Sequence, residues 1–179
     1  MSGIIESKEP VMSPDADWYA DTLFVASRGS TAYRLDSPPS DAQTDHVPVV
    51  ICLHDLTNCS YMWKDFAHLL VNARTGPPAR VLVMDFYGHG RSPYTKGTKL
   101  TLEVFVSQLH ELLYATGLLE EGVPFLLVGQ GMGAIVACGF CSKYPDLVRS
   151  LCLLAPLGVC WTDSIAGNPV EEVRLKNFP

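Results

Sequence analysis

The sequence has few charged residues and no basic cluster. Asp, Glu, Lys and Arg make up 18% of its 179 residues, and 13 basic residues are outnumbered by 19 acidic ones. Because proteins that bind nucleic acids or membrane surfaces gather Lys and Arg on one face, this balance argues against both kinds of partner. Hydrophobic residues make up 47% of the chain, which excludes a disordered or coiled-coil protein and is enough for a core.

A secretory signal is also missing. Residues 1–17 are polar and contain no apolar run after a basic start. We therefore expect a cytoplasmic protein with reduced thiols at its six cysteines, positions 52, 59, 138, 141, 152 and 160. We expect residues 1–20 to be a flexible N-terminus, residues 21–157 to form one domain and residues 158–179 to be a tail.

One stretch without charge, residues 122–141, is long enough for a membrane helix. Its glycines at 129 and 133 also have a spacing that pairs membrane helices. Pro124 and a third glycine, Gly131, interrupt the stretch, which favours a buried strand, a glycine turn and a buried helix. We therefore predict no transmembrane segment.

Strand and helix patterns alternate along the chain. Apolar runs predict six strands, at 22–27, 31–35, 47–54, 81–86, 123–128 and 149–155. Helical spacing predicts three helices, at 61–73, 102–116 and 132–144. The first would bury a stripe of Trp63, Phe66, Leu69 and Leu70, and the second would bury residues 102, 105, 106, 109, 112 and 113. This order predicts an α/β fold of three layers, in which helices flank a mostly parallel sheet of about six strands.

A glycine-rich segment, residues 129–134 (GQGMGA), follows a predicted strand and opens a helix. It fits a dinucleotide-binding fingerprint, but that reading needs an acidic residue at the end of the next strand, and residues 153–155 are Leu-Leu-Ala. It also fits the frame of a nucleophile elbow, G-x-S-x-G, with Gly131 in the nucleophile position. Dinucleotide binding is therefore the minor alternative.

Three segments at predicted strand ends together resemble the α/β-hydrolase fold superfamily. Residues 53–57 (LHDLT) resemble its His-Gly oxyanion segment, residues 85–92 (DFYGHGRS) its D-x-x-G-x-G-x-S loop and residues 128–134 (VGQGMGA) its elbow. The resemblance covers about residues 22–157. It implies the strand order 1-2-4-3-5-6 and an incomplete fold that lacks the last strands and the lid. We expect no cofactor and no metal.

The resemblance also implies a site. It places oxyanion-type backbone N–H groups at Leu56 and Met132, and a pocket lined by His54, Asp55, His89 and Gln130. We expect His54 and His89 to be structural there, Asp85 to bond its own loop, and Cys138-x-x-Cys141 to be packing residues rather than a metal or redox pair.

Three departures from the family pattern concern catalysis. Gly131 has no nucleophile, and Asp55 stands where the family has glycine. A carboxylate there would narrow the oxyanion pocket or repel a developing oxyanion. The family order is nucleophile, acid and then His, yet all five histidines precede the elbow, at 46, 54, 68, 89 and 110. Asp163, in the place of the acid in some members, would have no His to orient.

Two functions follow from this pattern. The first is a catalytically inactive pseudo-hydrolase that binds a small acyl or apolar ligand or a partner, which Gly131 favours. The alternative is a truncated or altered form of a serine hydrolase of esters, which the abrupt end favours. The strand at Leu151–Ala155 would be an apolar sheet edge, so we also expect self-association or a partner chain there.

Overall fold

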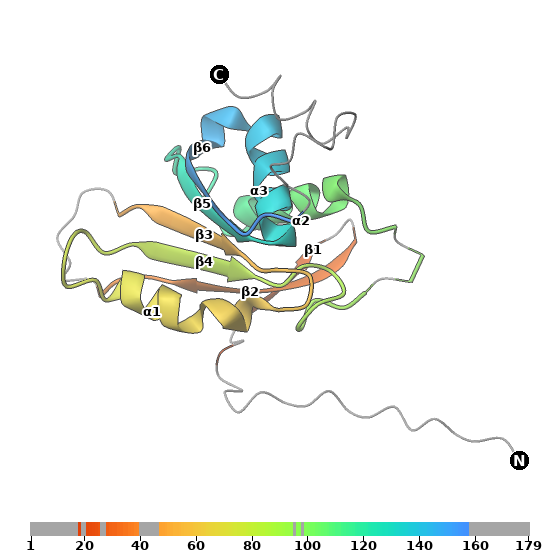
Figure 1. Cartoon of the computed structure of the whole chain (residues 1–179), viewed down its shortest axis with the longest axis horizontal. Coiled ribbons are helices and arrows are strands. Elements are labelled where there is room, and N and C mark those ends of the chain that lie inside the picture. Colours follow the sequence, from red (N-terminus) through yellow and green to blue (C-terminus); the bar gives the residue numbers. More distant parts are fainter. Residues whose placement is uncertain are drawn as a thin grey trace, which may run out of the picture.

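The structure is a computed structural model that describes residues 18, 21–25, 28–39, 47–94, 96–97 and 99–157. A six-stranded sheet in the order β1-β2-β4-β3-β5-β6 lies at its centre (Figure 1). The strands are β1 (Asp21–Val25), β2 (Gly29–Asp36), β3 (Val49–Leu53), β4 (Arg80–Met84), β5 (Phe125–Gln130) and β6 (Val148–Leu154). β1 and β2 form an antiparallel hairpin, β2 is antiparallel to β4, and the other pairs are parallel. The strand order implied by the resemblance is confirmed.

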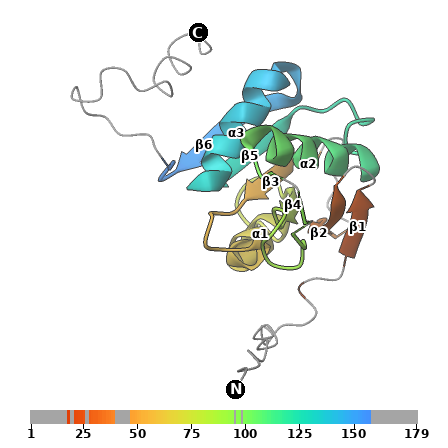
Figure 2. The same ribbon diagram turned by 90° about the vertical axis from the view of Figure 1, so that its right-hand side faces the viewer.

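Helices cover both faces of the sheet. α1 (Lys64–Val71) lies on one face, and α2 (Leu102–Ala115) and α3 (Met132–Lys143) lie on the other (Figures 1 and 2). The side chains of β3 alternate between the two faces of the sheet. Val49, Ile51 and Leu53 belong to the core beneath α2 and α3. Val50 and Cys52 belong to the core beneath α1. This division is why all five residues are buried and why the strand reads as a continuous apolar run.

The uncharged stretch at residues 122–141 is divided between β5, a turn at Gly131 and most of α3. Among the helices of the described ranges, none combines the length and apolar character that a membrane crossing requires. No disulfide joins the five cysteines in this part of the chain, and Cys160 lies outside it. Cys138 and Cys141 are both half-buried on α3.

The predicted buried stripe of the first helix is wrong in part. Phe66 and Leu69 are 37% and 68% exposed, whereas Trp63, Ala67 and Val71 are buried. The segment begins as a 3-10 turn (Ser60–Trp63) before α1, and α1 then contacts the sheet through every fourth residue. Because successive residues of an α-helix are about 100° apart, Leu69 lies on the side opposite the buried Ala67 and faces solvent.

Trp18 is an exception to the expected flexible N-terminus. Its side chain is buried in the core beneath α1, where it packs edge-on against Tyr61. The Arg34 guanidinium stacks over its ring at 5.0 Å from the ring centre. Sequence patterns give no sign of this because Trp18 stands outside any periodic apolar run.

The loop after β4 is held by buried hydrogen bonds. The Asp85 carboxylate accepts from the Ser60 N–H (2.6 Å) and from the Arg91 N–H (2.8 Å). The Ser92 hydroxyl donates to the Asp85 carbonyl oxygen (2.7 Å) and accepts from the Ala32 N–H (2.9 Å). The prediction that Asp85 bonds its own loop is confirmed, and Ser92 also ties that loop to β2.

Gln108 on α2 completes this network, and the apolar pattern of the helix does not predict it. Its side-chain oxygen accepts from the Tyr87 N–H (3.1 Å), and its side-chain nitrogen donates to the Asp85 carbonyl oxygen (3.0 Å) and to the Thr31 hydroxyl (3.1 Å). Leu102, which we predicted to be buried, is instead 38% exposed. It lies beside Gly139 of α3, which has no side chain to cover it.

We predict that Ser92→Ala lowers the free energy of unfolding by about 1–3 kcal/mol, because the Ala32 N–H loses its buried acceptor. Ser150→Ala makes the same chemical change at an exposed site on β6 and should stay within about 0.5 kcal/mol of the parent. Urea unfolding of the three proteins measures both differences. Equal effects of the two substitutions would contradict the structural role of Ser92.

Candidate functional site

The three motif segments meet at the carboxyl ends of the central strands. The Phe86 N–H after β4 donates to His54 Nε2 after β3 (3.0 Å). His89 Nε2 donates to the Leu56 carbonyl oxygen (2.7 Å). The Met132 N–H, the first of α3, donates to the Asp55 carboxylate. The sequence therefore predicts correctly which segments come together, although no periodic pattern links them.

The turn between β5 and α3 has the backbone of an elbow. Gly131 has φ +53° and ψ −114°, a conformation that side chains rarely adopt. Its N–H donates to the Leu154 carbonyl oxygen (3.0 Å), which fixes the turn to the end of β6. A Cβ on Gly133 would lie 2.6 Å from the His54 carbonyl oxygen, so α3 packs against the segment after β3 only because this residue is glycine.

The Asp55 carboxylate accepts hydrogen bonds from the N–H groups of Leu56 and Met132, which we predicted to be oxyanion-type donors. One carboxylate oxygen, Oδ1, accepts from both N–H groups at 2.8 Å. These two hydrogen bonds, the one from Met132 above all, lower the pKa of Asp55 below its ordinary value, so the group is charged at neutral pH. Within the described ranges this carboxylate has no ion-pair partner.

The same carboxylate fills the space of a side chain at position 131. A Cβ on Gly131 would overlap Oδ1 and Cγ of Asp55 and would lie 2.7 Å from Oδ2. A nucleophile at position 131 and the observed Asp55 side chain therefore exclude one another. The sequence places a carboxylate near the oxyanion pocket, but it does not reveal that Asp55 and Gly131 share one volume.

His54 is fully buried, so its ring faces no open pocket. Because Nε2 accepts from the Phe86 N–H, the proton resides on Nδ1, which donates to the Asp55 carbonyl oxygen (2.7 Å). Burial lowers the pKa of His54 and keeps the ring neutral. Both nitrogens are thus engaged with backbone groups, and neither can accept a proton from a substrate or nucleophile.

The other predicted site residues lie around Asp55. His89 is half-buried and contacts two backbone carbonyls, those of Leu56 and Tyr87. Its ring lies 5.2 Å from that of His54. Gln130 is half-buried at the end of β5. His46 and Asp163 lie outside the described residues, and among the described ones no three His, Cys, Asp or Glu side chains group to hold a metal ion.

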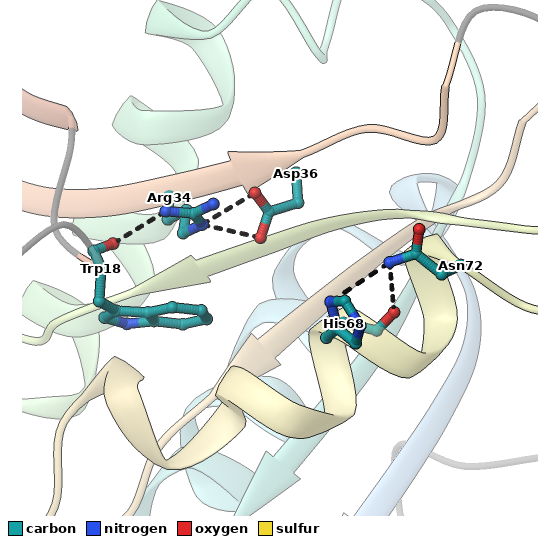
Figure 3. A network of polar contacts seen from close by, with 5 residues as sticks. All are labelled: Trp18, Arg34, Asp36, His68 and Asn72. Atoms are coloured by element: carbon teal, nitrogen blue, oxygen red, sulfur yellow. Dashed lines mark hydrogen bonds and ion pairs between the residues drawn. The ribbon is translucent and has the colours of Figure 1, made fainter. Parts of the chain in front are cut away.

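A separate groove of about 570 Å³ lies between β2 and α1. Some of the residues that line it are hydrogen-bonded to one another (Figure 3). Arg34 Nε donates to both carboxylate oxygens of Asp36 (2.8 Å each), and Asn72 Nδ2 donates to the His68 carbonyl oxygen (2.9 Å). No residue of the elbow or of the segment after β3 lines it, so it is distinct from the predicted site.

We predict that Gly131→Ala destabilises the fold more than Gly117→Ala. Both positions have positive φ, which costs about 1–3 kcal/mol for alanine, but only the Gly131 side chain would meet another group. In an Asp55→Ala background the cost of Gly131→Ala should fall, with an interaction free energy of about 0.5–3 kcal/mol. Denaturant unfolding of the four-member cycle measures it, and additive effects would show that the two residues do not share the space.

The chain is similar in sequence to proteins named as a lipase and a lysophospholipase. Human monoacylglycerol lipase ABHD6 is 28% identical over 130 residues, 72% of this chain and 36% of that protein. The probable lysophospholipase BODYGUARD 4 of Arabidopsis thaliana is 27% identical over 160 residues, 87% of this chain and 34% of that protein. The chain thus spans about a third of the length of these relatives.

Solved structures agree on the fold. A hydrolase from Pseudomonas aeruginosa matches with a TM-score of 0.61 and 26% identity, over 75% of this chain and 45% of that one. The thioesterase domain from the curacin biosynthetic pathway matches with a TM-score of 0.63 and 23% identity, over 87% and 49%. The family model of serine aminopeptidase S33 matches residues 44–176. The chain belongs to this family of the α/β-hydrolase superfamily.

Proposed function

We propose that this chain is a non-hydrolytic member of its family, a pseudo-hydrolase that binds a ligand or a partner. The observation that carries this proposal is the place of the Asp55 carboxylate. This carboxylate accepts hydrogen bonds from the N–H groups of Leu56 and Met132, and it fills the space that a side chain at position 131 would need. An acyl-transfer site needs that space for a nucleophile and those donors for the oxyanion.

Neighbouring groups do not supply the missing chemistry. The Ser92 hydroxyl is 1% exposed and holds two backbone groups, so it cannot reach an acyl substrate. His54 has no free nitrogen lone pair, as its Nε2 accepts from the Phe86 N–H. These contacts support structural roles for both residues rather than roles as nucleophile and base.

A second candidate is an altered or partial form of a serine hydrolase that acts on esters or other acyl substrates. Its relatives include proteins named as a lipase and a lysophospholipase, and the chain spans about a third of their length. In that case the acid, the base and the substrate pocket would belong to sequence beyond this chain, and Gly131 and Asp55 would be the two obstacles within it.

Labelling with a fluorophosphonate probe and hydrolysis of short p-nitrophenyl esters test the proposal. We expect no elbow labelling and no ester turnover by the chain, by Gly131→Ser or by Gly131→Ser/Asp55→Gly, since no histidine follows the elbow. An active serine esterase serves as the positive control. Stoichiometric labelling or turnover by the unaltered chain would contradict the pseudo-hydrolase proposal.

The same substitutions in any longer parent chain distinguish the two candidates. If the double variant of the parent hydrolyses esters, the parent retains a base and the second candidate gains support. If it stays inactive while it remains folded, the non-hydrolytic function extends to the whole protein. Gly131→Ser alone should be less active than the double variant, because its Cβ must displace the Asp55 carboxylate, which leaves a negative charge beside the N–H groups that an oxyanion needs.

We also propose that the chain self-associates through β6. This strand is at the edge of the sheet, and Leu153 and Leu154 are 38% and 41% exposed. Exposed apolar edge strands pair readily with other chains. The predicted edge ran to Ala155, but β6 ends at Leu154 and Ala155 turns away with φ +42°.

We predict that Leu153→Lys lowers the mass of any oligomer, because a charge at the edge opposes strand pairing. Leu69→Lys is the matched control, since Leu69 is also exposed but lies on α1. Size-exclusion chromatography with light scattering measures the mass. A monomeric parent chain, or an effect of Leu69→Lys alone, would overturn the role of β6.

A further inference from the structure

We propose that Asp55 reverses the polarity of the elbow site, so that the site binds a ligand ammonium group and rejects carboxylates and other oxyanions. The inference rests on the proposed non-hydrolytic function and adds the chemical class of ligand. A hydrolase elbow offers N–H donors to a negative oxygen. Here the donors are already used, and a carboxylate oxygen stands in front of them.

The two N–H donors of the elbow site already donate to a side chain of the protein itself. Asp55 Oδ1 accepts from the N–H groups of Leu56 and Met132 at equal distances of 2.8 Å. Leu56 follows Asp55 directly, whereas Met132 is 77 residues further on, so the carboxylate bridges two separate segments. A ligand anion would have to displace a tethered group, whose effective concentration is on the order of millimolar or higher.

The second carboxylate oxygen of Asp55, Oδ2, is the oxygen that remains for a ligand to contact. Both hydrogen bonds of the carboxylate use Oδ1. Oδ2 lies 2.7 Å from the position of a Cβ on Gly131, which is the space from which an elbow side chain reaches its substrate. Asp55 as a whole is half-buried, so part of the residue is in contact with solvent.

The N–H groups of Leu56 and Met132 stabilise the Asp55 charge, but no cationic side chain among the described residues pairs with it. Within the described ranges Asp55 forms no salt bridge, and the adjacent His54 ring is neutral because both its nitrogens are bonded to the backbone. A primary ammonium would supply the opposite charge and donate a charge-assisted hydrogen bond to Oδ2. A carboxylate would bring a second negative charge beside the first.

Two probes of equal size and opposite charge test the inference, butylammonium and butyrate. The readout is the amide resonances of Gly131, Leu56 and Met132 in the ¹⁵N-labelled chain, with potassium chloride as the ionic-strength control. For the parent chain we expect saturable shifts of these resonances with butylammonium and none with butyrate.

Two substitutions at Asp55 separate its charge from its hydrogen bonds. Asp55→Asn keeps an oxygen for the Leu56 and Met132 N–H groups but removes the charge, so binding of butylammonium should be lost and butyrate should still not bind. Asp55→Gly leaves both N–H groups without their acceptor, so butyrate should now shift their resonances. The dispersed amide spectrum of each variant shows whether it is folded.

Several outcomes would overturn the inference. These are shifts of the three resonances with butyrate in the parent chain, no shifts with butylammonium, or equal butylammonium binding by Asp55→Asn. Failure of a folded Asp55→Gly protein to respond to butyrate would show that the two N–H groups do not form an anion site. None of these results depends on ester turnover, so failure of this inference is distinguishable from failure of the proposed function.

Discussion

The hydrogen bonds from Leu56 and Met132 to Asp55 Oδ1 connect the segment after β3 to the start of α3. Around this bridge, close backbone approaches hold the elbow in place, above all that of Gly133 to the His54 carbonyl oxygen. The Asp55 side chain thus occupies the N–H groups that the family resemblance predicts as oxyanion donors. In the observed conformation of Asp55, a side chain at position 131 would collide with the carboxylate, so one of the two groups would have to move.

The loop after β4 shows a similar use of motif residues for structure. Asp85 and Ser92 bond backbone groups, and buried Gln108 on α2 links that loop to the helix layer. His54 is held in one neutral form between two backbone groups. The polar residues of the three motif segments thus connect three loops at the carboxyl edge of the sheet.

Local patterns predicted most of the fold but less of the site. Apolar runs located the strands because β3 and β4 are covered on both faces, and the motif order fixed the sheet order through the family resemblance. Periodicity failed on α1, where the buried face runs through Ala67 and leaves Leu69 exposed, and for Gln108, whose burial depends on partners distant in sequence. The shared volume of Asp55 and Gly131 joins residues far apart in the chain, so only the folded structure reveals it.

The most direct test of this account is the pH titration of the Leu56 and Met132 amide resonances. If Asp55 Oδ1 accepts from both, the two resonances should shift together, with one midpoint below the ordinary aspartate pKa of about 3.9, since the hydrogen bonds lower the pKa of Asp55. Asp55→Asn should abolish the shared transition. Resonances that titrate separately, do not titrate, or share a midpoint at or above the ordinary value would contradict an oxyanion site held by Asp55.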